Sequence, residues 1–242
     1  MVVAEAVQTP ARLGGFSRRT LWRHAATGAA AAGVVVAGSP ATLAFAQSDA
    51  STLRLNAGSE PDTIDPQKAS FVGEIDKIMR VFRNLLQFDK TSALVPDQAA
   101  EMPKVSDGGK TFTFTLKKGL VYSDGTPLTA KNYEYGWKRH LDPAVAGDYA
   151  SLGYIIVGAE AYNSADLKKT SADDLKKLRD AVGVKALDDL TLEIKLTDPA
   201  PWFLSVLATW CGLPSREELV NKGGETWTDP ATYVGNGPYI LT

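Results

Sequence analysis

Cysteine, histidine and methionine are scarce in this sequence, which has one, two and three of them among 242 residues. The single cysteine, Cys211, has no partner within the chain, so an internal disulfide framework is excluded. It lies beside the apolar Trp210, and we expect a buried thiol rather than a nucleophile. His24 and His140 form no cluster with the spacing of zinc ligands. The composition therefore predicts neither a zinc centre nor a disulfide scaffold.

Motifs for nucleotide binding and for enzyme chemistry are also missing. No Walker-type phosphate loop occurs, and the pair Gly235-x-Gly237 lacks a third glycine. No nucleophile elbow precedes a predicted helix. The carboxylate pair Asp188-Asp189 lies in a turn setting, where such side chains form turn and capping hydrogen bonds. We expect no cofactor and no enzymatic activity.

The chain carries little net charge, −2 at pH 7. Residues 1–46 hold four Arg and one Glu, so 26 basic residues less four leave 22 in the remainder, and 28 acidic residues less one leave 27, a net charge of −5. The basic residues are dispersed, apart from short runs such as Lys117-Lys118. This distribution argues against a nucleic-acid partner, which would need a basic groove or patch.

Residues 1–46 have the features of an export signal. The twin arginines Arg18 and Arg19 precede a stretch rich in Ala, Gly and Val, and the small-residue site Ala44-Phe45-Ala46 follows it. These features resemble a twin-arginine (Tat) signal peptide that is cleaved after about Ala46. A Sec signal and a membrane anchor are the alternatives. The anchor is disfavoured because the stretch is dominated by Ala and Gly, whereas a membrane span needs about 20 strongly apolar residues.

A strand, a turn and a helix follow one another between Gly109 and Arg139. Phe112, Phe114 and Leu116 alternate with threonines, as in a half-buried strand. Asp124-Gly125-Thr126-Pro127 has the composition of a tight turn. A helix is predicted over residues 130–140 with Thr129 as its N-cap, because Tyr133, Gly136, Trp137 and His140 fall on one face.

The remaining patterns predict a mixed chain of the α+β class. In residues 73–83, Ile75, Ile78, Met79 and Phe82 fall on one helical face, and we expect the charged residues of the segment, Glu74 among them, to face water. The segment 141–165 shows no clear periodicity and is predicted to be loose. Further helices are predicted over 173–182, 202–210 and 216–221, and strands over 51–57, 85–89, 184–186, 191–196 and from Tyr239 onward.

These residues resemble the family 5 solute-binding proteins of bacterial ABC importers, whose members share a "tF.LRkgvkfsDGtplTA.Dv.ysw.R" block that is similar to Gly109–Arg139. The resemblance extends from about Leu53 to the last residue and is greatest for the oligopeptide-binding branch. Four other stretches agree with the family in order and spacing: Gly58–Pro66, Val81–Asp89, Val184–Pro201 and Val234–Tyr239.

The resemblance implies a mixed α/β fold similar to a type II periplasmic binding protein, with two hinged lobes and an inserted small domain. After the signal peptide, we expect 47–88 to be a first-lobe segment, 89–196 the inserted domain and 197–242 a return to the first lobe. Family members are about twice as long, so the C-terminal half is expected to be missing.

The resemblance also implies the site and the partners. Glu60, Pro61 and Asp62 are expected to form one wall of a peptide cleft, although the prolines of this segment could merely shape a connection. Either Tyr149 or Tyr154 is expected to face the peptide backbone, with an ordinary packed tyrosine as the alternative for each. The expected partners of this periplasmic, monomeric protein are a peptide ligand and the membrane permease and ATPase subunits of an importer.

Two alternatives stay open on the sequence. The same fold could bind another solute, such as a dipeptide, a murein peptide, a nickel chelate, haem or a sugar, because the family covers all of these. A Tat-exported enzyme is the other alternative, although no cofactor motif supports it.

Overall fold

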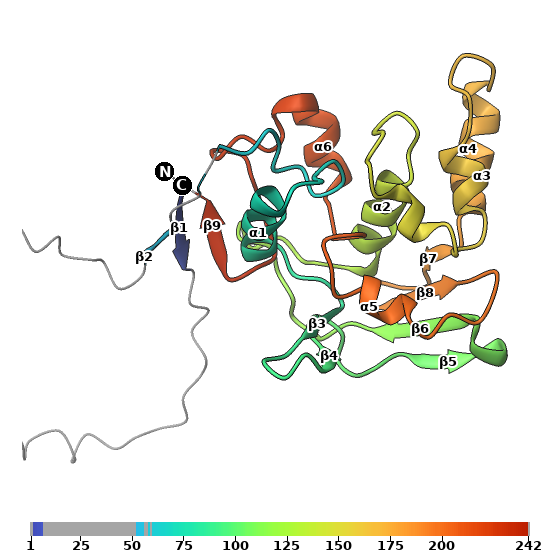
Figure 1. Cartoon of the computed structure of the whole chain (residues 1–242), viewed down its shortest axis with the longest axis horizontal. Helices are drawn as coiled ribbons and strands as arrows, with labels where there is room; N and C mark the ends of the chain where they lie inside the picture. The colour runs from blue at the N-terminus through green and yellow to red at the C-terminus, as the bar shows by residue number, and fades with distance from the viewer. Residues whose placement is uncertain (1, 7–51, 56–57, 59, 242) are drawn as a thin grey trace, which may run out of the picture. The chain divides into compact units, whose positions relative to one another are not determined.

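The computed structural model of the chain describes residues 2–6, 52–55, 58 and 60–241 (Figure 1). Within them helices and strands are mixed, as the α+β prediction requires. Arg18, Arg19, Ala44 and Ala46, on which the signal-peptide prediction depends, lie outside the described residues. Each of the described helices is too short or too polar to cross a membrane.

A four-stranded antiparallel sheet is formed by strands that lie between Lys104 and Lys195 in the chain. Its order is β5 (Lys104–Ser106), β6 (Thr111–Thr115), β8 (Thr191–Lys195) and β7 (Val184–Ala186). Phe112 pairs with Ile194 and Phe114 pairs with Leu192, and all four side chains are buried. The alternation in the sequence therefore predicted both the strand β6 and its apolar face.

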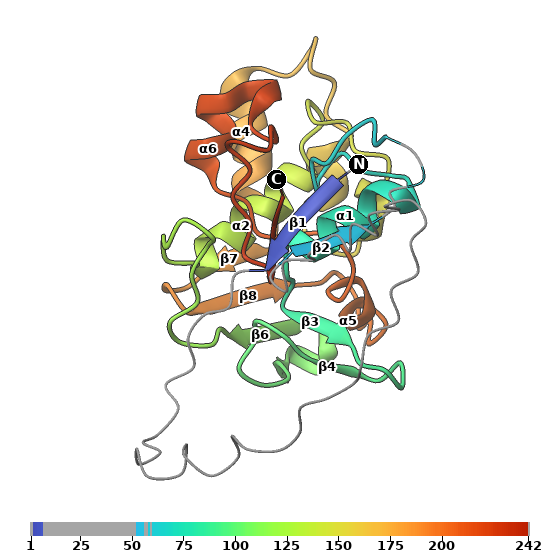
Figure 2. The ribbon, with the colours of Figure 1, turned by 90° about the vertical axis from the view of Figure 1, so that its left-hand side faces the viewer.

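Helix α2 (Ala130–His140) covers one face of this sheet in both views (Figures 1 and 2). Its bounds are those predicted, and the Tyr133, Trp137 and His140 side chains are buried. Thr129 begins the helix through a capping box, in which the Thr129 N–H donates to Asn132 Oδ1 at 2.9 Å. Gly136 lies so close to the chain at Leu213 that a Cβ atom there would be 2.0 Å from the Leu213 carbonyl oxygen.

The other elements agree with the predicted types within a few residues, apart from short helical turns that were not expected. A small hairpin is formed by β3 (Leu86–Phe88) and β4 (Leu94–Pro96). The remaining helices are α1 (Val72–Val81), α3 (Ala159–Asn163), α4 (Ala172–Ala181), α5 (Phe203–Val206) and α6 (Glu217–Gly223), with 3₁₀ turns at Asp107–Gly109, Ala150–Gly153 and Gly224–Thr226.

Two predictions about these segments are wrong in part. The helix expected over 202–210 is only one turn, α5, because the backbone then continues in 3₁₀-like turns to Gly212, whose φ of +67° ends them. The segment 141–165, expected to be loose, contains α3. Tyr162 on α3 is buried, and its hydroxyl donates to Asp142 Oδ2 at 2.9 Å, so a tertiary contact that leaves no periodic pattern stabilises this helix.

A second, three-stranded antiparallel sheet has the order β2 (Thr52–Leu55), β1 (Val2–Ala6) and β9 (Tyr239–Leu241). Of the strands predicted over 51–57 and from Tyr239, the described residues form β2 over Thr52–Leu55 and β9 over Tyr239–Leu241. Strand β1 lies between them and pairs with both, Ala4 opposite Leu53 on one side and opposite Leu241 on the other.

The buried apolar residues form two clusters. The larger cluster joins the four-stranded sheet and α2 to Leu85, Leu86 and the α5 segment. The smaller cluster surrounds Phe82 and includes Ile78, Trp227 and Tyr233. Trp210 packs against both clusters and therefore connects them.

Candidate functional site

Three of the five predicted ligand-binding residues line one cavity. Glu60, Pro61 and Asp62 form a wall of a hollow of about 260 Å³ beside the N-terminus of α1. The other lining residues are Phe71, Gly73, Glu74 and Lys77. The resemblance therefore identified one side of this hollow, and the opposite side was missed.

Among the lining residues that the sequence analysis missed is the exposed Phe71, whose neighbour Val72 is exposed as well. Phe71 and Val72 are 65% and 83% exposed, although residues of their kind are usually buried. Phe71 has an extended backbone (φ −99°, ψ 145°) and immediately precedes α1. An apolar pair at the helix start, with Phe71 as the N-cap and Val72 as the first helical residue, was the sequence signal for this surface.

Glu74 holds the loop from Thr63 to Phe71, and its burial corrects the sequence prediction that it faces water. It is 3% exposed, whereas the helical pattern placed it on the solvated face. Its Oε1 accepts a hydrogen bond from the Thr63 N–H at 3.2 Å, and its Oε2 accepts from the Ser70 and Phe71 N–H groups at 3.0 and 3.1 Å. The loop folds over the first turn of α1 and excludes the water that the pattern expected there.

Lys77, one turn further along α1, is buried for the same reason. Its Nζ donates to the Gly73 carbonyl oxygen at 2.8 Å. Its ammonium lines the cavity together with the Glu60 and Asp62 side chains, so groups of both signs surround the hollow.

A buried ion pair lies beneath the loop. Arg139, near the end of α2, donates from both terminal nitrogens to the Asp65 carboxylate at 2.6 Å and from Nη1 to Gln67 Oε1 at 2.7 Å. The Trp227 indole N–H donates to the same carboxylate at 3.2 Å, and the guanidinium lies 5.5 Å from the centre of the Trp227 ring. The network joins the loop to α2 and to the segment after α6.

Tyr149 is connected to this loop through Trp210. The two rings meet edge to face at 5.1 Å between centroids, and the Trp210 indole N–H donates to the Ala69 carbonyl oxygen at 3.2 Å. The Tyr149 carbonyl oxygen lies 3.2 Å from His140 Nε2, so its backbone is held as well. Tyr149 is partly exposed and therefore accessible to a ligand.

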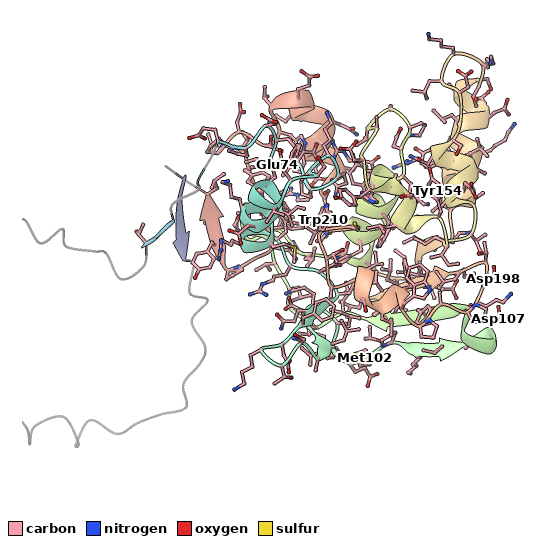
Figure 3. All side chains as sticks on the ribbon, viewed as in Figure 1. Glu74, Met102, Asp107, Tyr154, Asp198 and Trp210 are labelled. Atoms are coloured by element: carbon pink, nitrogen blue, oxygen red, sulfur yellow. The ribbon has the colours of Figure 1, made fainter. Side chains whose placement is uncertain are left out.

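Tyr154 occupies a different environment. Its hydroxyl donates to Asn163 Oδ1 at 2.6 Å, and its ring packs against the larger apolar cluster. In Figure 3 it lies on the far side of Trp210 from Glu74. Tyr149, rather than Tyr154, is thus connected through Trp210 to Ala69, and neither tyrosine lines the hollow of Glu60–Asp62.

Two titratable side chains outside the loop, His140 and Cys211, are buried and have pKa values that favour their neutral forms. Burial lowers the pKa of His140 from 6.5 to about 4, which keeps the imidazole neutral near pH 7. Burial raises the pKa of the Cys211 thiol to about 11, as expected for an inert cysteine. Among the described residues, no group of three His, Cys, Asp or Glu side chains is arranged to hold a metal ion.

Comparisons with known proteins identify the family of this chain. Residues 93–242 match the family described as bacterial extracellular solute-binding proteins, family 5 Middle. The chain is 35% identical over 226 residues to the probable deoxycholate-binding periplasmic protein YgiS of Escherichia coli and 34% identical over 226 residues to the periplasmic oligopeptide-binding protein OppA of the same organism. Each alignment covers 93% of this chain and 40% of the relative, so the chain spans well under half the length of these proteins.

A solved structure gives the same result for the fold. The complex of Haemophilus influenzae OppA with the peptide RPPGFSPFR superposes with a TM-score of 0.65 and 31% identity, over 75% of this chain and 34% of the other. The family match covers more than half of the residues and includes the whole four-stranded sheet and β9. The chain therefore belongs to the family 5 bacterial extracellular solute-binding proteins.

Proposed function

We propose that this chain supplies one wall of the peptide site in the substrate-binding component of a bacterial ABC importer. The observation that carries the proposal is the hollow formed by Glu60–Asp62 and the exposed Phe71, in a member of a solute-binding family. Carboxylates beside an apolar surface suit a peptide, which has amide groups, charges and apolar side chains. The extended backbone at Phe71 suits the same ligand, because extended segments pair with bound peptides.

Within this function, Glu60, Pro61 and Asp62 contact the peptide from one side and Tyr149 contacts it from another. Tyr149 is preferred to Tyr154 because its ring reaches the loop through Trp210, whereas the Tyr154 hydroxyl is already bonded to Asn163. In the domain division implied by the family pattern, 47–88 and 197–242 belong to the first lobe and 89–196 is an inserted small domain; this lobe and a second lobe close around the ligand by a hinge motion.

The cellular setting follows from the same proposal. The protein acts in the periplasm as a monomer, after export and removal of residues 1–46, a cleavage that also removes strand β1 from between β2 and β9, and it delivers its ligand to the permease and ATPase subunits of an importer. Support comes from the relatives YgiS and OppA of Escherichia coli, both of which are named periplasmic.

The experiment is to purify the full-length mature protein, denature it and identify the released small molecules by mass spectrometry. A ligand that binds only the folded state raises the melting temperature when it is added back. A mixture of short peptides, each of which raises the melting temperature, is the expected result.

A single bile acid, sugar, haem or metal chelate that raises the melting temperature would instead refute the peptide assignment. The bile acid has a specific precedent, because one relative is named as probably binding deoxycholate. In that case the roles of Glu60–Asp62 and Tyr149 towards a peptide would be withdrawn as well.

A further inference from the structure

We infer that Glu74 is a positioning residue for the ligand site: its buried carboxylate fixes the loop that joins the two sides of the hollow. This inference rests on the proposed function. It concerns the segment from Thr63 to Phe71, which connects the two sides of the hollow.

The first observation is the set of hydrogen bonds that the Glu74 carboxylate accepts. The N–H groups of Thr63, Ser70 and Phe71 converge on its two oxygens, so one side chain accepts from both ends of the loop. Backbone N–H groups that lack a partner in a buried position are costly. Glu74 is therefore the acceptor that allows the loop to close over the start of α1.

The second observation is the position of the loop between Glu60–Asp62 and Phe71. Glu60–Asp62 come directly before Thr63, and the exposed Phe71 and Val72 come directly after Ser70. Fixing Thr63 against Ser70 and Phe71 thus fixes the distance between the two walls. A loop that is ordered before the ligand arrives avoids the entropy that binding would otherwise cost.

The third observation is that the middle of the loop is held by hydrogen bonds that do not involve Glu74. The N–H groups of Lys68 and Ala69 donate to the Asp65 carbonyl oxygen, both at 3.0 Å, and the Gln67 N–H donates to Asp65 Oδ1 at 3.0 Å. The middle of the loop is held by its own turn and by Arg139, so the ends are the part that depends on Glu74. Loss of the carboxylate is expected to loosen the ends and leave the turn in place.

The test compares the wild-type protein with Glu74→Gln, because an amide keeps the size of the side chain but replaces one acceptor oxygen with an NH₂ donor. The matched control is Asp76→Asn on the same helix. It removes the same charge from an exposed carboxylate that pairs with Arg80 at 2.8 Å and does not line the hollow.

Binding of trialanine and of RPPGFSPFR to the full-length protein is measured by calorimetry, well below the melting temperature. The affinity of Glu74→Gln is expected to fall by about tenfold or more, because the loop must now be ordered during binding. Asp76→Asn should bind as the wild type does. A wild-type affinity in Glu74→Gln would overturn the inference.

Hydrogen exchange gives a readout that general destabilisation does not reproduce. The Thr63, Ser70 and Phe71 amides should exchange faster in Glu74→Gln, with no change at the Phe112 and Phe114 amides in β6. Unchanged exchange at the three loop amides, or an equal increase in β6, would overturn the inference. If Glu74→Gln does not fold, Glu74→Asp is used, since it keeps the charge but is too short to reach both ends of the loop.

The two proposals fail in different ways. If the folded wild-type protein binds neither peptide, the proposed function is wrong and the ligand role of Glu74 is refuted with it. If the wild type binds and Glu74→Gln binds equally well, only the role of Glu74 is refuted.

Discussion

Breaking the buried ion pair between Asp65 and Arg139 should destabilise the protein strongly. Both side chains are at most 9% exposed, and the carboxylate accepts two hydrogen bonds from the guanidinium at 2.6 Å. Removing one partner of such a pair leaves a buried charge uncompensated, at a cost of about 3–5 kcal/mol. For a protein of this size that cost corresponds to a fall in melting temperature of roughly 6–20 °C.

The assay is urea unfolding of the mature protein, followed by tryptophan fluorescence, for Asp65→Asn, Arg139→Met and the double variant. Because both singles remove the same interaction, the double variant should cost less than the two singles together, with a coupling energy of about 0.5–3 kcal/mol. Asp189→Asn is the control, because its exposed pair with Lys131, at 3.6 Å, is screened by water.

Additive effects of the two substitutions, or single-variant losses under about 1 kcal/mol, would contradict this reasoning. Additivity would mean that the carboxylate is stabilised by the Trp227 and Gln67 N–H groups alone. Small losses would mean that water replaces the missing partner.

Three further outcomes follow from the structure. Gly136→Ala should lower the melting temperature by several degrees, because the new methyl carbon would be 2.0 Å from the Leu213 carbonyl oxygen; a value like the wild type's would show that α2 shifts freely. Burial lowers the pKa of His140 to about 4, while the pKa in the unfolded state stays near 6.5. The stability due to the neutral imidazole is therefore complete above pH 6.5 and is lost as the pH falls towards 4. The urea midpoint of His140→Gln should change less between pH 6.5 and pH 4 than that of the wild type. Cys211, with a thiol pKa raised to about 11 by burial, should react with a thiol reagent at pH 8 only in denaturant, and rapid reaction in native buffer would show that the segment opens.

The sequence predicted those elements whose pattern is local. The alternation around Phe112 and Phe114 gave β6, and the stripe of Tyr133, Trp137 and His140 gave α2 with its bounds. In both, a single apolar face meets a single partner, so periodicity and burial agree.

The burial predicted from the sequence was wrong where a loop covers a helix. Glu74 and Lys77 have the spacing of a solvated face, yet the loop over the start of α1 buries them. A periodic pattern describes only the helix, and it carries no record of a segment folded back on it. The same limit hid the exposed Phe71, which lines the candidate hollow, and its exposed neighbour Val72, because both resemble core residues.

The choice between Tyr149 and Tyr154 shows the limit for the candidate site. Both tyrosines lie in a Gly- and Ala-rich stretch, and nothing in their neighbours distinguishes them. The contact between Tyr149 and Trp210 joins positions 61 residues apart in the chain, so only the tertiary structure separates the two.

The buried network beneath the site loop also has a consequence for the order of folding. Its hydrogen bonds join Asp65 to Arg139, 74 residues apart, Gln67 to Leu213, 146 apart, and Trp227 to Asp65, 162 apart. Each long closure costs chain entropy before its contacts form, and folds dominated by such contacts assemble slowly. We therefore expect the site loop to be among the last parts of the chain to reach its final structure, after the helices and hairpins that hold it have formed.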